Sequence, residues 1–178
     1  MLAALIWLLV CGPSGAAEYS QPTAPPPWIR TDVQTDPIGP IPVHLYFGSP
    51  SGAYLISENR VVGETGDSVQ LARAILEALI SGPQSNLNRT LPAASRLRAV
   101  FIGTDNICTA DFNSAIREGH PGGCRGEMLT VYSIVNSLII NIPSIKKIKL
   151  LIDGNDIESL AGHINMQIPL PANMLIIR

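Results

Sequence analysis

The chain has 178 residues, of which 46% are hydrophobic and 15% are charged, and its formal net charge is −2. This length suits one compact domain with a tail. The pI near 5.9 argues against a nucleic-acid-binding protein, and the mean hydropathy of +0.25 is too high for a disordered chain. With only 15 Gly and 15 Pro, the composition also excludes a collagen-like protein.

The N-terminus predicts export from the cytoplasm by one of two routes. Residues 2–10 form an unbroken apolar run, which has the length of a signal-peptide core and is too short to span a membrane. Small residues follow, so one interpretation is a signal peptide over residues 1–17. The other is a lipoprotein leader that ends at Cys11, because the sequence there is similar to a bacterial lipobox. Val10 departs from that motif, since its position usually holds Gly, Ala or Ser.

Prolines are concentrated in residues 18–42. Proline fixes the backbone φ angle and removes an N–H donor, so this segment is expected to be an extended, semi-rigid linker without a core of its own. A tether of this kind fits a domain held away from a membrane. A proline-rich ligand for a partner's groove is the alternative. The folded domain is expected over residues 43–178.

The first half of the domain predicts strands followed by a helix. Residues 43–47 are rich in β-branched and aromatic residues and predict a strand, and two shorter strands are expected at 53–56 and 60–62. A helix follows, with Asp67 as its N-cap and Gln70 as the capping-box partner. Gly82 and the proline after it supply the stop signal.

The second half predicts a hairpin, a second helix and a further strand. The expected segments are strands at 97–102 and 107–112, a helix from about 127 to 141, a strand at 148–152 and one or two short strands within 164–177. The order is strand, helix, hairpin, helix, strand. It predicts an α/β domain of the two-layer α+β type, with two helices on one face of a mixed sheet.

An ordered series of short motifs runs through the predicted domain. It comprises VHLYF at 43–47, ENR at 58–60, LEALISGP at 76–83, YSIVNSL at 132–138, LIDG at 151–154 and LAGH at 160–163. In this order and spacing, from about Val43 to Leu170, the chain resembles the GerM-type (GerMN) domain of bacterial sporulation, spore germination and cell-envelope proteins.

The resemblance implies a non-catalytic domain that acts outside the cytoplasm, in the periplasm or anchored to the membrane by a lipid, as a scaffold or adaptor for other envelope proteins. The resemblance brings no catalytic set with it. No cofactor, metal or small-molecule substrate is expected, and nucleic acid is not an expected partner. The resemblance does not show that the host sporulates. The alternative function is that of a periplasmic cell-wall glycan-binding protein or hydrolase.

Two cysteines remain if Cys11 is lipidated or removed with the leader. Cys108 lies on a predicted strand and Cys124 just ahead of the second helix, so a disulfide that closes this short loop is one expectation in an oxidising compartment. Two free thiols are the second. Metal binding with the nearby His120 is a third, although three ligands at irregular spacing do not match a zinc motif.

Two further sets of polar residues are candidates for function. Glu58 and Arg60 face the same side of an extended strand and form either a surface ion pair or a partner-binding patch. A concave pocket lined by the four residues His44, Asp111, Glu127 and His163 would favour the enzyme or glycan-binding alternative, whereas a flat surface with an exposed sheet edge would favour the scaffold. The helix dipole alone accounts for a glutamate at position 127.

Overall fold

The computed structural model describes residues 39–63 and 66–178. The predicted leader over residues 1–17, the lipidation candidate Cys11 and most of the predicted linker over residues 18–42 lie outside the described residues. None of the described helices combines the length and the apolar character that crossing a bilayer requires.

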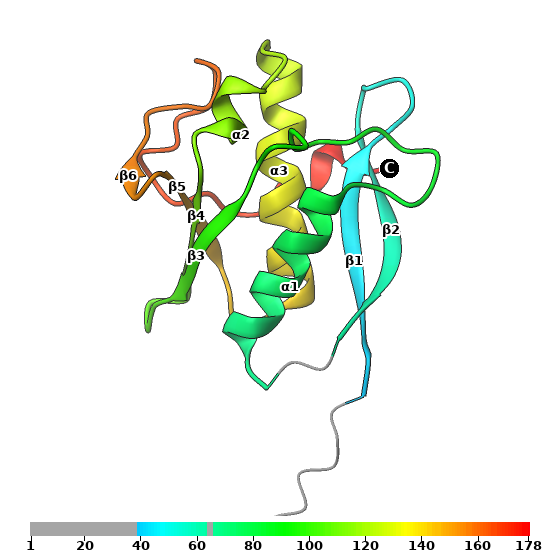
Figure 1. The fold of residues 1–178 in the computed structure, drawn as a ribbon, viewed down its shortest axis with the longest axis vertical. Helices are drawn as coiled ribbons and strands as arrows, with labels where there is room; N and C mark the ends of the chain where they lie inside the picture. Colours follow the sequence, from blue (N-terminus) through cyan, green and yellow to red (C-terminus); the bar gives the residue numbers. More distant parts are fainter. Residues whose placement is uncertain (1–38, 64–65) are drawn as a thin grey trace, which may run out of the picture. The chain divides into compact units, whose positions relative to one another are not determined.

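Within the described residues, six strands form two separate sheets (Figure 1). The first sheet is an antiparallel hairpin of β1 (Ile41–Gly48) and β2 (Leu55–Val62). The second sheet has the order β3 (Leu97–Ile102), β4 (Ile107–Phe112), β5 (Lys147–Ile152) and β6 (Asn155–Asp156). Its β4–β5 pair is parallel and its other two pairs are antiparallel, so this sheet is mixed.

The two main helices lie between the sheets. They are α1 (Ser68–Ser81) and α3 (Cys124–Asn141), and a short helix α2 (Ala115–Glu118) and a 3-10 turn at Met174–Ile176 complete the helical elements of the described chain (Figure 1). The α+β class, the mixed sheet and the hairpin are therefore confirmed. The first strands, however, form a sheet of their own, so the helices face a sheet on either side.

Helix α1 begins and ends at the predicted signals. The Asp67 side chain accepts a hydrogen bond from the Gln70 N–H at 2.8 Å, and the Gln70 side chain accepts one from the Gly66 N–H at 3.1 Å. At the other end Gly82 has a φ of 90°, and its N–H donates to the Leu79 carbonyl at 3.1 Å. A positive φ of this kind favours glycine, which explains the stop at this position.

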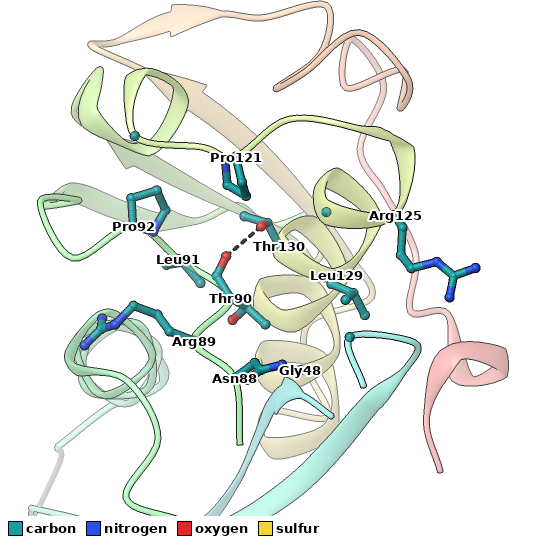
Figure 2. Close-up of a pocket in the computed structure, with 13 residues that line it drawn as sticks. Gly48, Asn88, Arg89, Thr90, Leu91, Pro92, Pro121, Arg125, Leu129 and Thr130 are labelled. Carbon is teal, nitrogen blue, oxygen red and sulfur yellow. Dashed lines mark hydrogen bonds between the residues drawn. The ribbon is translucent and has the colours of Figure 1, made fainter. Parts of the chain in front are cut away.

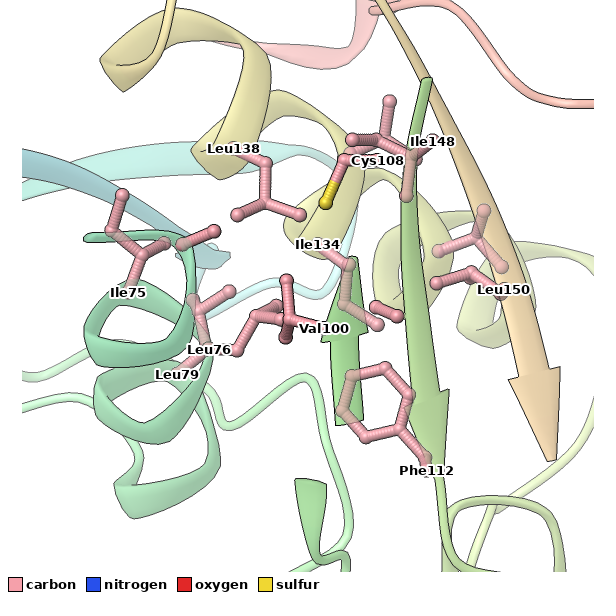
Figure 3. Packing of buried hydrophobic residues seen from close by; sticks show 14 of the residues in the cluster. Ile75, Leu76, Leu79, Val100, Cys108, Phe112, Ile134, Leu138, Ile148 and Leu150 are labelled. Carbon is pink, nitrogen blue, oxygen red and sulfur yellow. The ribbon is translucent and has the colours of Figure 1, made fainter. Parts of the chain in front are cut away.

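The main hydrophobic core of the described residues joins α1, α3 and both sheets. Leu76 and Leu79 of α1 are fully buried and share a cluster with Val100 of β3 and Ile134 of α3 (Figure 3). The apolar face of α1 packs on this cluster. Its opposite face is exposed to solvent and carries the charged residues Arg73 and Glu77. Helix α3 differs, since polar as well as apolar side chains of it are buried.

A polar row on α3 explains why the first strands stay separate from the second sheet. The Tyr46 N–H donates to Ser137 Oγ at 3.0 Å, and the Ser133 hydroxyl donates to the Tyr46 carbonyl at 2.5 Å. One turn further on, Asn141 accepts from the His44 N–H at 2.9 Å and donates to the His44 carbonyl at 2.8 Å. The helix thus occupies the edge of β1 that a further strand would need.

Several predicted boundaries differ from the structure. The two short strands expected at 53–56 and 60–62 are one strand, β2, and the helix expected from about 127 begins at Cys124. The helix α2 was not expected. In place of strands within 164–177, the chain makes two isolated bridges, from Leu170 to β5 and from Ile177 to β2, and the 3-10 turn.

Candidate functional site

A groove of about 450 Å³ opens where the β1–β2 turn, the α1–β3 connection and the start of α3 meet (Figure 2). Its volume is in the range of ligand pockets. We call it the groove, and its lining residues are Gly48, Gly52, Asn88, Arg89, Thr90, Leu91, Pro92, Gly119, Pro121, Arg125, Gly126, Leu129 and Thr130.

A chain of hydrogen bonds fixes one wall of the groove. The Gly122 N–H donates to Nδ1 of His120 at 2.9 Å, so Nδ1 is an acceptor and Nε2 carries the ring proton. Nε2 lies 3.1 Å from Thr130 Oγ1, and that hydroxyl donates to the Thr90 carbonyl at 2.6 Å (Figure 2). His120, weighed from sequence as a metal ligand, instead positions the wall of the groove.

The only charged side chains that line the groove are two arginines. Arg89 donates to the carbonyls of Ile80 and Ser81, the latter at 2.7 Å, and so satisfies the C-terminus of α1. Arg125 is exposed and makes no hydrogen bond or ion pair within residues 39–63 and 66–178. The groove therefore has a positive rim and no carboxylate, although the whole chain is slightly acidic.

Glu58 and Arg60 form an ion pair that is almost buried. Their side chains are 10% and 9% exposed. The Glu58 carboxylate accepts from the backbone N–H groups of Gln84 and Ser85, at 3.1 and 2.8 Å, and from the Ser85 hydroxyl. Arg60 stacks over the Phe47 ring, 5.7 Å from its centroid. The pair was a partner-binding candidate in the sequence, but here it fastens β2 to the loop after α1 and offers little surface to a partner.

The contacts of Glu58 set its ionisation. Burial alone would raise the pKa of the Glu58 carboxyl, but the hydrogen bonds from Ser85, Arg60 and Gln84 outweigh it and lower the pKa to about 2. The carboxylate is therefore charged at any pH at which the domain would work, which suits a structural ion pair.

Glu127 holds the loop after β6. Its side chain has no exposed surface, and it accepts hydrogen bonds from the backbone N–H groups of Leu160, Ala161 and His163 at 2.8–2.9 Å. The His163 ring nitrogen Nδ1 lies 3.1 Å from the same carboxylate. We call this arrangement the Glu127 corner. Burial raises the pKa of Glu127, but these hydrogen bonds more than offset the rise and hold the pKa below its ordinary value.

Sequence reasoning missed the Glu127 corner, because it assigned this glutamate to the helix dipole. Its donors lie 33 to 36 residues further along the chain, which no local pattern reveals. One signal was available in the sequence. The loop sequence LAGH at 160–163 follows a strand, and its backbone N–H groups need hydrogen-bond acceptors.

The four-residue pocket that would have favoured an enzyme is not formed by the described residues. Only Glu127 and His163 come together. Asp111 accepts from the Gly154 N–H at 2.9 Å and lies 3.4 Å from an Arg98 nitrogen, whereas the backbone of His44 bonds to Asn141. With its oxygens already committed to loop N–H groups, the Glu127 carboxylate has no open approach for a substrate.

The expected disulfide is not formed in this structure. Cys108 is fully buried, Cys124 is exposed, and both thiols are free. The Cys108 side chain lies in the core beside Leu138 and Ile148 (Figure 3). Cys124 begins α3, and at 1.5 Å per residue the helix carries Leu138 about 21 Å away from it. The spacing of the cysteines along the chain does not reveal the end of α3 against which Cys108 packs.

Burial also decides the chemistry of the core thiol, because it raises the pKa of Cys108 to about 12. Within residues 39–63 and 66–178 no group of three or more His, Cys, Asp or Glu side chains is placed to hold a metal ion. His120 is bonded to Gly122 and Thr130, as described above.

Known proteins similar to this chain share its fold. The family model described as Sporulation and spore germination (Germane) matches residues 44–158. No curated protein matches the chain. A solved candidate lipoprotein from Clostridium perfringens is 26% identical with a TM-score of 0.54, over 75% of this chain and 89% of that one.

Two solved structures of the sporulation protein GerM from Bacillus subtilis are also similar. Its first GerMN domain is 22% identical with a TM-score of 0.58, over 75% of this chain and 94% of that one. Its tandem GerMN domains give 20% identity and a TM-score of 0.58, over 76% of this chain but only 45% of the tandem. At these identities the likeness shows the fold alone.

The family match spans the described domain from β1 to the residues after β6, and the likeness in fold extends over three quarters of the chain. Both agree with the resemblance drawn from the ordered motifs. The chain therefore belongs to the Germane family of sporulation and spore germination domains.

Proposed function

We propose that this domain is a non-catalytic scaffold or adaptor that acts outside the cytoplasm by binding other envelope proteins. The observation that carries the proposal is the contrast between its polar sites. The strongest acid and base candidates, in the Glu58–Arg60 pair and the Glu127 corner, are committed to internal hydrogen bonds. The groove, by contrast, is open and has an arginine without a partner in the described chain.

Family membership supports a role in sporulation or germination, or in a related envelope process. The resemblance to a candidate lipoprotein supports a location at the envelope. A binding function needs an accessible surface of defined shape and charge rather than a reactive group, and the groove supplies both.

The test is crosslinking in living cells of the native host with a tagged full-length chain, followed by mass spectrometry of the proteins that co-purify. We expect specific envelope proteins to be recovered, and to be lost when the residues from Val43 onward are deleted. Recovery of wall glycan without any protein partner would contradict the proposal and favour the glycan-binding or hydrolase alternative.

We further propose that residues 1–17 direct export, and that residues 18–42 hold the domain away from the membrane. A Cys11→Ser variant distinguishes the two leaders. If Cys11 carries a lipid, this variant should lose incorporation of a labelled fatty acid and leave the membrane fraction. If signal peptidase cuts after residue 17 instead, the wild-type protein should take up no label, and its N-terminus should begin at Glu18.

A further inference from the structure

Strand β2 forms the outer edge of the first sheet, and part of that edge has no neighbouring strand among the described residues (Figure 1). The Leu55 carbonyl accepts a hydrogen bond from the Arg178 N–H at 3.0 Å, so the backbone groups of Leu55 point away from β1. Because the backbone groups of an antiparallel strand point alternately toward its partner and away from it, those of Ser57, Asn59 and Val61 also point away from β1. All three residues are exposed, so another chain can reach them.

The hydrogen bonds of β1 support the same alternation. Tyr46 lies opposite Ser57, and its backbone N–H and carbonyl bond to side chains of α3 rather than to β2. His44 lies opposite Asn59 and bonds to α3 in the same way. The backbone groups of Ser57 and Asn59 are therefore not used within the hairpin, and they make no hydrogen bond to any other segment of the described chain.

The remaining strand edges in the described part of the chain are blocked or protected. The polar row on α3 occupies the edge of β1, and β6 is only two residues long. The edge strand β3 has a bulge between Leu97 and Ala99 and carries Arg98, whose side chain is 44% exposed. Bulges, short strands and charges are the usual means by which proteins prevent edge pairing. Strand β2 has eight residues, pairs with β1 without a bulge, and carries only uncharged side chains at its exposed positions, so it lacks this protection.

The charges of β2 favour a second copy of the same strand as its partner. If a two-fold axis passes through Asn59, Glu58 of one copy lies opposite Arg60 of the other. Ser57 then lies opposite Val61 of the second copy. An axis at Glu58 would instead place two carboxylates opposite each other, and an axis at Arg60 would do the same with two guanidinium groups. Like charges directly opposite each other destabilise a sheet, whereas opposite charges stabilise it.

The ends of β2 favour the same register. An axis at Ser57 would need the Leu55 carbonyl, which already accepts a hydrogen bond from Arg178. An axis at Val61 would place Ser57 opposite a residue beyond the end of β2. The axis at Asn59 avoids both obstacles and pairs all three of the residues whose backbone groups are free.

We propose that two copies of this chain associate through β2, which pairs antiparallel with its counterpart about a two-fold axis at Asn59. The two hairpins then form one four-stranded sheet. Because both copies use the same edge, the assembly closes at two chains. This inference goes beyond the proposed function and does not depend on it. The paired segment is short, so we expect a weak dimer that dissociates at concentrations of roughly 10–100 μM.

Disulfide trapping tests the register. In the proposed dimer the two Asn59 Cα atoms lie about 5.5 Å apart, which a disulfide can bridge, whereas the two Ser57 Cα atoms lie about 14 Å apart. In a Cys11→Ser and Cys124→Ser background, Asn59→Cys should therefore form a disulfide with its own copy at least about tenfold faster than Ser57→Cys does. Ser57→Cys mixed with Val61→Cys should form the mixed disulfide, because these positions lie opposite each other.

Sedimentation equilibrium of the purified full chain in a density-matched, non-ionic detergent tests the association itself. We expect the average mass to rise from one chain toward two as the concentration increases. Asn59→Lys places two like charges on the axis and should raise the dissociation constant by about tenfold or more. Asn155→Lys makes the same change at an exposed position of β6 and should alter it by less than about twofold. Circular dichroism should show both variants folded, since both positions are exposed.

Three results would overturn the inference. The first is a single-chain mass at every concentration up to about 1 mM. The second is trapping of Ser57→Cys with itself as fast as trapping of Asn59→Cys, which would mean chance encounters or another register. The third is a chain that stays single but loses an envelope protein in the cell crosslinking experiment on Asn59→Lys substitution. The occupant of the β2 edge would then be a strand of that protein, and the scaffold function would stand.

Discussion

The Glu127 corner and the groove treat polar groups in opposite ways. In the corner, one buried carboxylate meets three backbone N–H groups and a histidine nitrogen, so nothing is left for a ligand. In the groove, the exposed Arg125 guanidinium lacks a partner among the described residues. Both regions contain residues that look functional in a sequence. The region whose polar groups already have hydrogen-bond partners stabilises the fold, and the region whose polar group lacks a partner can bind a ligand.

Glu58 and Arg60 belong with the Glu127 corner in this respect. Their charges face each other and the loop after α1, and burial of both side chains makes them part of the structure. Substitutions at the two carboxylates should act on stability, and substitutions in the groove should act on binding.

The largest effect is expected at Glu127. A Glu127→Ala substitution leaves three N–H groups without their acceptor in a buried site, so the free energy of unfolding should fall by about 3–4 kcal/mol. Urea denaturation measures this. Glu77→Ala, at an exposed position of α1, is the control and should cost less than about 0.5 kcal/mol. Similar losses for both variants would mean that the corner is not a structural element.

The fall in the free energy of unfolding at acidic pH should depend on Glu58. Its pKa of about 2 in the folded protein lies below the ordinary 4.5, so the folded state binds this proton less readily than the unfolded state. The contribution is full above about pH 5 and is lost as the pH falls toward 2, for a total of about 3 kcal/mol. Denaturation at a series of pH values measures it.

A Glu58→Gln variant supplies the control for the pH series. Compared with the wild-type chain, it should be less stable at pH 7 and should lose less stability on acidification. The pH dependence that remains is due in part to Glu127, whose pKa is also lowered. A wild-type chain and a Glu58→Gln chain with parallel pH curves would show that Glu58 does not carry this effect.

The two cysteines sharpen the contrast between core and groove. Cys108→Ser places a hydroxyl in an apolar core and should cost about 2 kcal/mol, whereas Cys124→Ser, next to Arg125, should cost less than about 0.5 kcal/mol. In a Cys11→Ser background, both thiols should react with a thiol reagent in denaturant without reductant. A disulfide would instead be shown if the protein were lighter by two hydrogens than its reduced form and both serine variants lost the same stability.

The smallest effect on stability is expected in the groove itself. Arg125→Ala should change the free energy of unfolding by less than about 0.5 kcal/mol, because the side chain is exposed and has no partner in the described chain. Thermal melting checks this. A marked drop in stability would place Arg125 with Glu127 and remove the distinction between the two regions.

Local chemistry made several elements readable from sequence. Asp67 and Gln70 start α1 and Gly82 ends it, and each acts on backbone groups within a few residues. The β3–β4 hairpin is just as local, since its turn at 103–106 joins strands that pair directly. The predicted start of the second helix, at about residue 127, lies after the observed start of α3 at Cys124. The reason is that the apolar pattern begins only after the first turn, whose residues are small or charged.

The candidate site was far less readable. The groove brings together the β1–β2 turn, the α1–β3 connection and the start of α3, none of which carries a motif. Cys108 and Cys124 are close in sequence and apart in space, whereas Glu127 and His163 are the reverse. Closeness along the chain therefore suggested a disulfide that the structure does not contain. Separation along the chain concealed the contact between Glu127 and His163.

The sequence by itself determined the two main helices, the β3–β4 hairpin, the α+β class and the family, because caps, turns and periodic apolar residues act over short distances and the family motifs keep their order. Only the tertiary structure decided that β1 and β2 stand apart from the second sheet, that Glu58 and Glu127 hold loops through internal hydrogen bonds, and that Arg125 lies at the groove without a partner in the described chain. These outcomes depend on which groups meet after the chain has folded, and hydrogen bonds across 30 or 90 residues leave no local pattern.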